Sequence, residues 1–401
     1  MKKIAVLGYG TVGSGVVEVL ETNKEAVAKK AGDEIEVKYV LDLKDFPGTP
    51  IEHKVVHDIN IILDDPEIVV VVEVMGGVEP AYTFTKNALL KGKSVITSNK
   101  ALVAAKGAEL LEVARERNLN FLFEASVGGG IPIIRPLNSS LTADKVNEIT
   151  GILNGTTNFI LTKMASEGSD FASVLSEAQA LGYAERDPSA DVEGYDACRK
   201  IAILSSIAFG KNVNYENIYT EGITKITDKD FMYAKAMNKS IKLLASSKDD
   251  NGKVYAIVAP MMISPEHPLY NVNGVVNGIN VNGNMLGDVM FIGAGAGKLP
   301  TASAVVTDVI DAIKHDGKNV ACFWSKEELK LSDIQESVKR FFVRIADSVE
   351  KSSVEAVFGK VNVIEIMKGE YAFVTEPMSE AKYSECASKL DGIITRIRMD
   401  R

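Results

Sequence analysis

The chain has 401 residues, of which 46% are hydrophobic and 25% are charged, a composition typical of a globular protein with two or three domains. Its 45 basic and 54 acidic residues give a net charge of −9, which argues against nucleic-acid or anionic-membrane partners because both need a basic face. Three scattered cysteines without a CxxC pair argue against a disulfide framework and indicate a reducing cytoplasm, and no apolar run is long enough for a signal peptide or a membrane span.

The first predicted element is a buried strand at residues 4–7, and the turn GYGTVG at residues 8–13 follows it directly. An amphipathic helix and a second strand at residues 35–41 come next. In this setting the first glycine permits a tight turn, the second lets the backbone approach a pyrophosphate, and the third lets the helix pack on the strand. Amides at the helix start then face the phosphates. A dinucleotide site is therefore preferred to a purely structural turn, and its predicted residues are Gly8, Gly10, Thr11, Val12 and Gly13.

Asp42 ends the second strand, where a carboxylate can hydrogen-bond an adenosine ribose. A solvated loop acid is the alternative interpretation. No arginine immediately follows the strand to bind a 2′-phosphate, although Lys38 and Lys44 are near. The sequence therefore leans toward NAD and leaves NADP open.

Strands and helices alternate as far as residue 123, which predicts a parallel, doubly wound sheet with ligands at the carboxyl ends of its strands. Met75 and Gly76 follow one such strand, and Ser98 and Lys100 follow the next. Lys100 is either an exposed lysine at a helix start or a group beside the nicotinamide, and the second interpretation is favoured.

The segment at residues 124–132, EASVGGGIP, contains three successive glycines. Such a run is typical of an interdomain hinge, or of a site where backbone carbonyls bind a monovalent cation. The residues alone favour the hinge.

A helix predicted at residues 159–164 follows the motif NGTTN. Thr156 or Thr157 is expected to cap this helix. Gly155 and Thr156 lie where free amides suit a substrate carboxylate, although capping alone also explains the motif.

The densest polar cluster occupies residues 182–200. Asp196 and Lys200 are four residues apart and therefore share one helix face, which as a surface ion pair is worth only about half a kcal/mol. The helix becomes apolar directly after Lys200, so we expect a partly buried lysine that can exchange a proton with an alcohol oxygen. Glu185, Asp191 and Asp196 are expected to bind a substrate ammonium group.

The loop GAGAGK at residues 293–298 is not a nucleotide-triphosphate loop. Ile292 occupies the first required glycine position, and Leu299 stands where serine or threonine is needed. The loop is predicted to open a helix at residues 301–315 that returns to the first domain, with Gly297 near the nicotinamide.

In their order along the chain, these motifs resemble those of the homoserine dehydrogenase family. The matching segments are GYGTVG at 8–13, VEVMGG at 72–77, TSNKALVA at 97–104, EASVGGGIPII at 124–134, NGTTNFI at 154–160, GYAERDPSADVEGYDACRKIAIL at 182–204 and GAGAGKLPTASAV at 293–305. The resemblance implies NAD(P)-dependent interconversion of L-homoserine and L-aspartate 4-semialdehyde, in threonine, methionine and isoleucine biosynthesis.

The resemblance also implies roles for single residues. Lys200 would be the proton donor or acceptor beside Asp196, and Lys100 would lie at the junction of nicotinamide and substrate. Substrate binding would fall to Glu185 and Asp191. Sodium would be held by Glu124, Val127, Gly129 and Ile131. With the resemblance taken into account, a cation site is preferred to the interpretation of this segment as a hinge alone. A homodimer or homotetramer built through the sheet of the middle domain is expected.

The expected fold is α/β and has three parts. These are a Rossmann domain at residues 1–133, completed by the helix at 301–315, an α+β catalytic and dimerisation domain at 134–300, and a tail at 337–401. Residues 324–336 are expected to be a charged linker. The tail has the predicted order βαββαβ, which resembles the regulatory ACT domain of many homoserine dehydrogenases. Its segment 346–351 lacks the usual Asp-x-Pro-Gly, so threonine inhibition is expected to be weak or absent, with the tail kept for assembly.

Two other functions remain open from the residues alone. Another Rossmann oxidoreductase that forms a thioester needs an activated cysteine, and Cys198 is the only candidate near a polar cluster. A non-catalytic dinucleotide sensor would bind NAD(H) without turnover, but the Asp196/Lys200 pair argues against it.

Overall fold

The computed structural model describes residues 1–400, and contacts divide the chain into two units. Unit 1 contains Met1–Lys145, Ala202–Tyr215 and Gly293–Leu329. Unit 2 contains Val146–Ile201, Glu216–Ile292 and the described chain from Lys330 onward. Each unit is described separately.

Unit 1 is built on a six-stranded parallel sheet with the order β3-β2-β1-β4-β5-β6. The strands are β1 Lys2–Leu7, β2 Ile35–Leu41, β3 Val55–Val56, β4 Ile68–Glu73, β5 Ser94–Thr97 and β6 Phe121–Leu122. The order reverses between β1 and β4, which is where ligands bind on sheets of this kind. The predicted doubly wound parallel sheet is confirmed.

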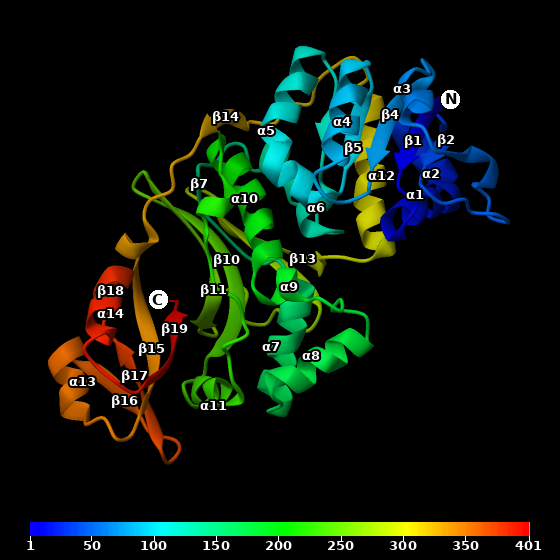
Figure 1. Ribbon diagram of the computed structural model, residues 1–401. Helices are drawn as coiled ribbons and strands as arrows, with labels where there is room; N and C mark the ends of the chain where they lie inside the picture. Colours follow the sequence, from blue (N-terminus) through cyan, green and yellow to red (C-terminus); the bar gives the residue numbers. More distant parts are fainter. Residues whose placement is uncertain (401) are drawn as a thin grey trace. The chain divides into compact units, whose positions relative to one another are not determined.

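Helices cover this sheet, and α12 comes from far along the chain to join them (Figure 1). Alanine and valine side chains of α12 share one buried cluster with those of α1 and β1. The helices of unit 1 are α1 Thr11–Thr22, α2 Lys24–Ala31, α3 Ile59–Leu63, α4 Ala81–Leu90, α5 Lys100–Glu116, α6 Ala125–Gly128 and α12 Lys298–Lys314, with the short turns η1 Glu52–Lys54 and η2 Pro136–Ser140. A two-stranded sheet of β8 (Lys211–Asn212) and β14 (Ser325–Glu328) completes the unit.

Unit 2 is built on an eleven-stranded sheet with the main order β13-β12-β7-β10-β11-β19-β15-β17-β16, to which β9 and β18 are attached at β11 and β15. The strands are β7 Val146–Ile152, β9 Tyr219–Thr220, β10 Ser240–Asp250, β11 Lys253–Ile263, β12 Val276–Gly283, β13 Gly287–Ala294, β15 Val338–Ala346, β16 Val361–Ile364, β17 Glu370–Thr375, β18 Met378–Ser379 and β19 Ile393–Met399. Its helices are α7 Gly155–Glu167, α8 Phe171–Ala180, α9 Ser189–Val192, α10 Tyr195–Phe209, α11 Asp228–Ala236, α13 Lys351–Phe358 and α14 Glu380–Ala387, with the short turns η3 Tyr215–Asn217 and η4 Ile334–Glu336. The part of α10 from Ala202 onward, and Tyr215 of η3, belong to unit 1.

The tail continues the sheet of unit 2. Strand β19 pairs in parallel with β11 through two residue pairs, Met261 with Arg398 and Met262 with Met399. The tail contains β15, α13, β16, β17, α14 and β19 in the predicted order βαββαβ, with the two-residue strand β18 added. Its own core is aromatic, with Phe341, Phe358 and Phe373 among the buried side chains.

Residues 324–336 differ from the expected linker. Trp324 is 4% exposed, residues 325–328 form β14, and residues 334–336 form a 3-10 helix. The charged composition hid the pairing of β14 with β8, since strand pairing depends on a partner more than one hundred residues away.

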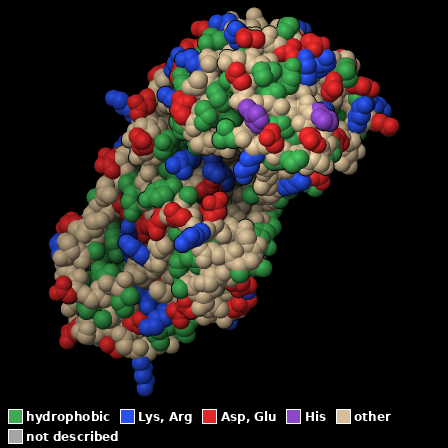
Figure 2. Space-filling model, turned by 45° about the vertical axis from the view of Figure 1, so that its right-hand side comes forward, with side chains coloured by type: hydrophobic (Ala, Val, Ile, Leu, Met, Phe, Trp, Pro, Cys, Tyr) green, Lys and Arg blue, Asp and Glu red, His purple; other side chains and the backbone are tan. Residues whose placement is uncertain are grey.

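Within residues 1–400, no helix is both long enough and apolar enough to cross a membrane. On the face shown in Figure 2, acidic and basic side chains are mixed over most of the surface.

Candidate active site

The turn between β1 and α1 has the geometry of a dinucleotide loop. Gly8 has a φ of 94°, and a Cβ on Gly13 would lie 2.0 Å from the Gly8 carbonyl oxygen, so the helix can approach the strand only because Gly13 has no side chain. A Cβ on Gly10 would meet no atom within 4 Å. Helix α1 begins at Thr11 without a side-chain cap, which leaves its first amides to an anion. These residues fit a dinucleotide pyrophosphate.

Asp42 has a structural role in addition to its expected role at the adenosine ribose. Its carboxylate accepts hydrogen bonds from the amide of Tyr9 at 2.8 Å and from the amide of Lys44 at 3.0 Å. Asp42 therefore fastens the glycine-rich turn to the end of β2, which holds a carboxylate at the place predicted for the adenosine ribose.

Glu73 was missed by the sequence analysis as a site residue. It is fully buried at the end of β4, where its carboxylate accepts bonds from the Met75 amide at 2.8 Å and from the Thr97 hydroxyl at 2.6 Å. Burial raises the pKa of Glu73. Asn99 adds a bond to the Gly77 carbonyl at 2.6 Å. The loops after β4 and β5, which carry Met75, Gly76, Ser98 and Lys100, are thus tied together.

The signal for Glu73 is present in the sequence. It is the one charged residue in the otherwise apolar run at residues 68–74. A carboxylate in such a strand needs donors nearby, and they come from the loops that the strand leads into.

Lys200 is buried in unit 2. Its side chain is 9% exposed, and its ammonium lies 2.8 Å from the Asp196 carboxylate and donates to the Leu153 carbonyl at 2.7 Å. The predicted helix face is present, since both residues lie on α10. An ammonium group has three donors, so these two contacts leave one for a substrate oxygen.

Asn154 joins the carboxylates of this group. Its amide nitrogen donates to Asp191 at 2.7 Å and to Asp196 at 3.0 Å. Its amide oxygen accepts from the Thr157 amide at 2.9 Å and so caps α7, which corrects the expectation that Thr156 or Thr157 is the cap. Helix α7 accordingly begins at Gly155, four residues earlier than predicted.

Three further residues were expected to bind the substrate, namely Gly155, Thr156 and Glu185. The Thr156 hydroxyl donates to the Tyr183 carbonyl at 2.6 Å. Gly155 lies against the backbone, because a Cβ there would be 2.8 Å from the Val275 carbonyl oxygen. Glu185 is exposed, and within residues 1–400 no hydrogen bond joins its side chain to Asp191 or Lys200.

The segment that begins at Glu124 is anchored inside unit 1. The buried Glu124 carboxylate accepts from three successive amides, those of Ile133, Ile134 and Arg135, at 2.6 to 2.8 Å. Gly129 has a φ of 57°, and a Cβ there would lie 2.4 Å from the Gly295 carbonyl oxygen. Close packing of this loop on the loop that carries Gly297 therefore accounts for the glycine at position 129.

Asp308 on α12 is expected to make the stability of the protein depend on pH. It accepts from the Glu124 amide at 2.8 Å and from Arg135 at 2.6 Å. Burial, together with the Glu124 carboxylate, raises the pKa of Asp308 to about 8 despite Arg135. The stabilisation from its bound proton is complete below about pH 4 and is lost as the pH rises through 8, by up to about 1.4 kcal/mol per pH unit.

Urea unfolding between pH 5 and pH 8 measures this effect, and Asp308→Asn should reduce the slope. The matched control is Asp311→Asn, one turn from Asp308, because Asp311 pairs with the same Arg135 at 2.8 Å but is 26% exposed. Equal slopes in wild type and Asp308→Asn would contradict the prediction.

Two family models match the chain. Residues 8–124 match a model described as "Homoserine dehydrogenase, NAD binding domain", and residues 132–310 match one described as "Homoserine dehydrogenase". The chain is 48% identical over 320 residues to a homoserine dehydrogenase of Synechocystis, which covers 78% of this chain and 73% of that protein.

Solved structures agree. A homoserine dehydrogenase from Thiobacillus denitrificans superposes with a TM-score of 0.92 at 33% identity, covering 100% of this chain and 98% of the other. A hyperthermophilic archaeal homoserine dehydrogenase in complex with NADPH superposes with a TM-score of 0.65 at 31% identity, covering 78% of this chain and 98% of the other.

Proposed function

The chain belongs to the homoserine dehydrogenase family, and from this premise we propose which of its residues move the proton and hold the substrate. The enzyme interconverts L-homoserine and L-aspartate 4-semialdehyde with a nicotinamide dinucleotide. The observation that carries the proposal is the buried Lys200 ammonium, held by Asp196 and the Leu153 carbonyl.

Lys200 acts as the acid and base of the reaction. A bound nicotinamide would supply the hydride chemistry at the substrate carbon, which leaves the proton to the protein. In the reducing direction the third N–H of Lys200 donates its proton to the carbonyl oxygen, which becomes the hydroxyl of homoserine. In the oxidising direction the neutral amine accepts that proton. Asp196 and the Leu153 carbonyl keep the amine aimed in one direction.

The carboxylates of Asp191 and Asp196 bind the substrate ammonium. Asn154 bridges both, at 2.7 and 3.0 Å, and so fixes their spacing. Glu185 contributes from its exposed position, and the first amides of α7, at Gly155 and Thr156, are available to the substrate carboxylate.

On the cofactor side, the glycine-rich turn binds the pyrophosphate and Asp42 binds the adenosine ribose. Met75, Gly76, Ser98 and Gly297 lie on loops of unit 1 that would border the nicotinamide. Lys100 stands at the first position of α5, where it assists substrate binding or proton transfer.

A thioester mechanism at Cys198 has little support. The Cys198 side chain is 4% exposed, and burial raises the pKa of its thiol. A nucleophilic cysteine needs the opposite setting, an accessible thiol whose pKa is lowered.

Steady-state oxidation of homoserine tests both the function and the cofactor choice. We expect kcat/KM with NAD to exceed that with NADP by at least about tenfold, because the Asp42 carboxylate repels a 2′-phosphate. Asp42→Asn keeps an oxygen for the Tyr9 amide and should narrow this preference. A higher kcat/KM with NADP in the wild type would contradict the assignment.

We also propose a homodimer or homotetramer formed through the sheet of unit 2. Strand β13 is the edge of that sheet, and its Met290 and Ile292 side chains are 39% and 53% exposed. Exposed apolar side chains on an edge strand favour pairing with a second copy. Light scattering tests this, and a monomer at micromolar concentration would contradict it.

A sodium ion is a further proposal for unit 1. Helix α6 ends after one turn, so carbonyls such as that of Val127 have no partner within the helix, and Gly129 and Ile131 follow directly. The Glu124 side chain serves its three amides, which leaves its carbonyl oxygen as the candidate ligand. Turnover that is identical in sodium and choline salts would contradict this site.

The tail is proposed to be a degenerate ACT-like domain that responds weakly or not at all to threonine. In the segment after β15, the Asp347 carboxylate accepts from the Gly369 amide at 2.9 Å, where effector-binding loops expose glycine backbone. Strong threonine inhibition in the same assay would contradict this. Three cysteines that form no disulfide within residues 1–400 favour a cytoplasmic enzyme of threonine, methionine and isoleucine biosynthesis.

A further inference from the structure

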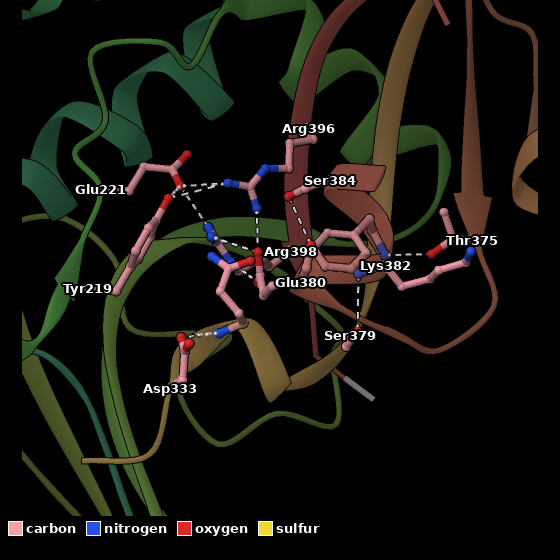
Figure 3. Close-up of polar contacts among 12 residues, drawn as sticks. Tyr219, Glu221, Asp333, Thr375, Ser379, Glu380, Lys382, Ser384, Arg396 and Arg398 are labelled. Carbon is pink, nitrogen blue, oxygen red and sulfur yellow. Dashed lines mark hydrogen bonds and ion pairs between the residues drawn. The ribbon is translucent and has the colours of Figure 1, made fainter. Parts of the chain in front are cut away.

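Strand β19 of the tail is joined by charge to the segment that follows β9 (Figure 3). The Glu221 carboxylate accepts from Arg398 at 2.7 Å and from Tyr219 at 3.0 Å, and it lies 3.4 Å from Arg396. Arg398 is 2% exposed, and its guanidinium lies over the Tyr219 ring. Glu221 is therefore held from the tail side by two arginines.

A second carboxylate, Glu380 on α14, completes the cluster. It accepts from Arg398 at 2.5 and 3.1 Å and from Arg396 at 2.9 Å. Burial opposes the charge of Glu221, but the two guanidinium groups outweigh it and lower its pKa. Two carboxylates thus balance two arginines, so Arg398 keeps an ionic partner if Glu221 loses its charge.

On its other side, the Glu221 segment lies against the turn formed by residues 192–194. A Cβ on Gly222 would lie 2.2 Å from the Val192 carbonyl oxygen, and the Ile223 amide donates to that same oxygen at 2.8 Å. Gly194 has a φ of 85°, and a Cβ there would lie 3.2 Å from Thr220. The two backbones are in contact, so the turn cannot shift independently of Glu221.

This turn separates the two carboxylates of the active site. Asp191 precedes it and Asp196 follows it, and Asn154 bridges them. A cavity of about 750 Å³ is lined by Glu193 and Tyr195, by Glu221 and by residues 393–396 of β19. Beside this cavity, Glu221 is bonded to the arginines of β19, and the Ile223 amide is bonded to the turn.

We propose that Glu221 is a positioning residue that uses Arg396 and Arg398 of the tail to hold the 192–194 turn, and so sets the spacing of Asp191 and Asp196 for the substrate ammonium. This inference rests on the proposed substrate role of those carboxylates. It gives the tail a direct influence on homoserine affinity.

The test is Glu221→Gln, which keeps the size of the side chain and removes its charge. The KM for homoserine is expected to rise about tenfold, with kcat and the KM for the dinucleotide within about twofold, because positioning affects substrate binding. Arg396→Gln removes the 3.4 Å contact to Glu221, one bond to Glu380 and the 3.3 Å bond to the Tyr219 hydroxyl. Because Arg398 still holds Glu221 at 2.7 Å, this variant should raise the same KM by less. Since Glu380 still pairs with Arg398, the Glu221→Gln variant should fold.

Glu370→Gln is the matched control. Glu370 is buried and pairs with Arg344 of the tail at 2.8 and 3.0 Å, and Arg344 also binds Asp230 at the start of α11, so this network likewise joins tail and body. Within residues 1–400, no hydrogen bond joins the Glu370 side chain to the 192–194 turn. Thermal melting of Glu221→Gln and Glu370→Gln measures how far the melting temperature falls when each carboxylate loses its ion pairs.

The proposal is supported if Glu221→Gln raises the homoserine KM while Glu370→Gln, at a comparable loss of melting temperature, does not. It is overturned if both variants change that KM equally or if neither does. Wild type and Lys200→Met are assayed alongside. A wild type without homoserine turnover, or an active Lys200→Met, refutes the proposed function instead, so the two failures are distinguishable.

Discussion

Replacing Lys200 with methionine is expected to lower kcat for homoserine oxidation by about a thousandfold or more, while the affinity for the dinucleotide stays within about twofold. General acid–base groups contribute factors of this size, and the buried amine of Lys200 is the group that we propose exchanges the proton. Methionine fills much of the volume in a site that is 7% exposed, so the helix around it should keep its packing. Stopped-flow cofactor binding and steady-state turnover measure the two quantities separately.

Lys242→Met is the matched control for this change. Lys242 is a second buried lysine of unit 2, 1% exposed, and it donates to the Val272 carbonyl and to Asn273, each at 2.7 Å. Burial lowers its pKa to about 8. Its replacement should change the melting temperature and leave kcat within about threefold, because it has no place in the proton transfer. If Lys200→Met oxidises homoserine at near the wild-type rate, Lys200 is not the acid and base of the reaction.

Chemical rescue distinguishes a catalytic role of Lys200 from a structural one. In Lys200→Ala a small cavity replaces the side chain beside Asp196, and added methylamine can occupy it. Partial recovery of kcat that rises with the concentration of the free amine would show that the missing group is a base. Recovery with sodium chloride alone would indicate a general salt effect.

Much of unit 1 could be predicted because its signals are local. Short apolar runs and a glycine turn before a helix determine a buried parallel sheet and its ligand edge, and the structure has that sheet. The burial of Lys200 could be predicted too, since α10 becomes apolar one residue later.

What could not be predicted depends on partners distant in sequence. Asn154 bridges carboxylates 37 and 42 residues away, and its motif alone suggested a threonine cap. The pairing of β19 with β11 and the ion pairs of Glu221 join residues more than one hundred positions apart. Nothing in the local pattern of charges distinguishes these contacts from solvated surface groups.

Asp196→Asn is expected to lower kcat/KM for homoserine by about a hundredfold while changing the melting temperature little. The asparagine oxygen can still accept from Asn154, so the local shape is retained. However, the Lys200 ammonium loses its ionic partner, and one of the two carboxylates proposed to bind the substrate ammonium is removed. Both losses act on the reaction, so kcat should fall together with the affinity for homoserine.

The split between kcat and KM separates catalysis from folding in this variant. Asp191→Asn is its control, because Asp191 accepts from the same Asn154 amide at 2.7 Å, whereas the carboxylate that lies 2.8 Å from Lys200 is that of Asp196. That control should raise the KM for homoserine and leave kcat within about threefold, since the partner of the lysine is intact. If Asp196→Asn instead lowers the melting temperature strongly and keeps the wild-type kcat, the carboxylate serves the fold and the proposed proton path is wrong.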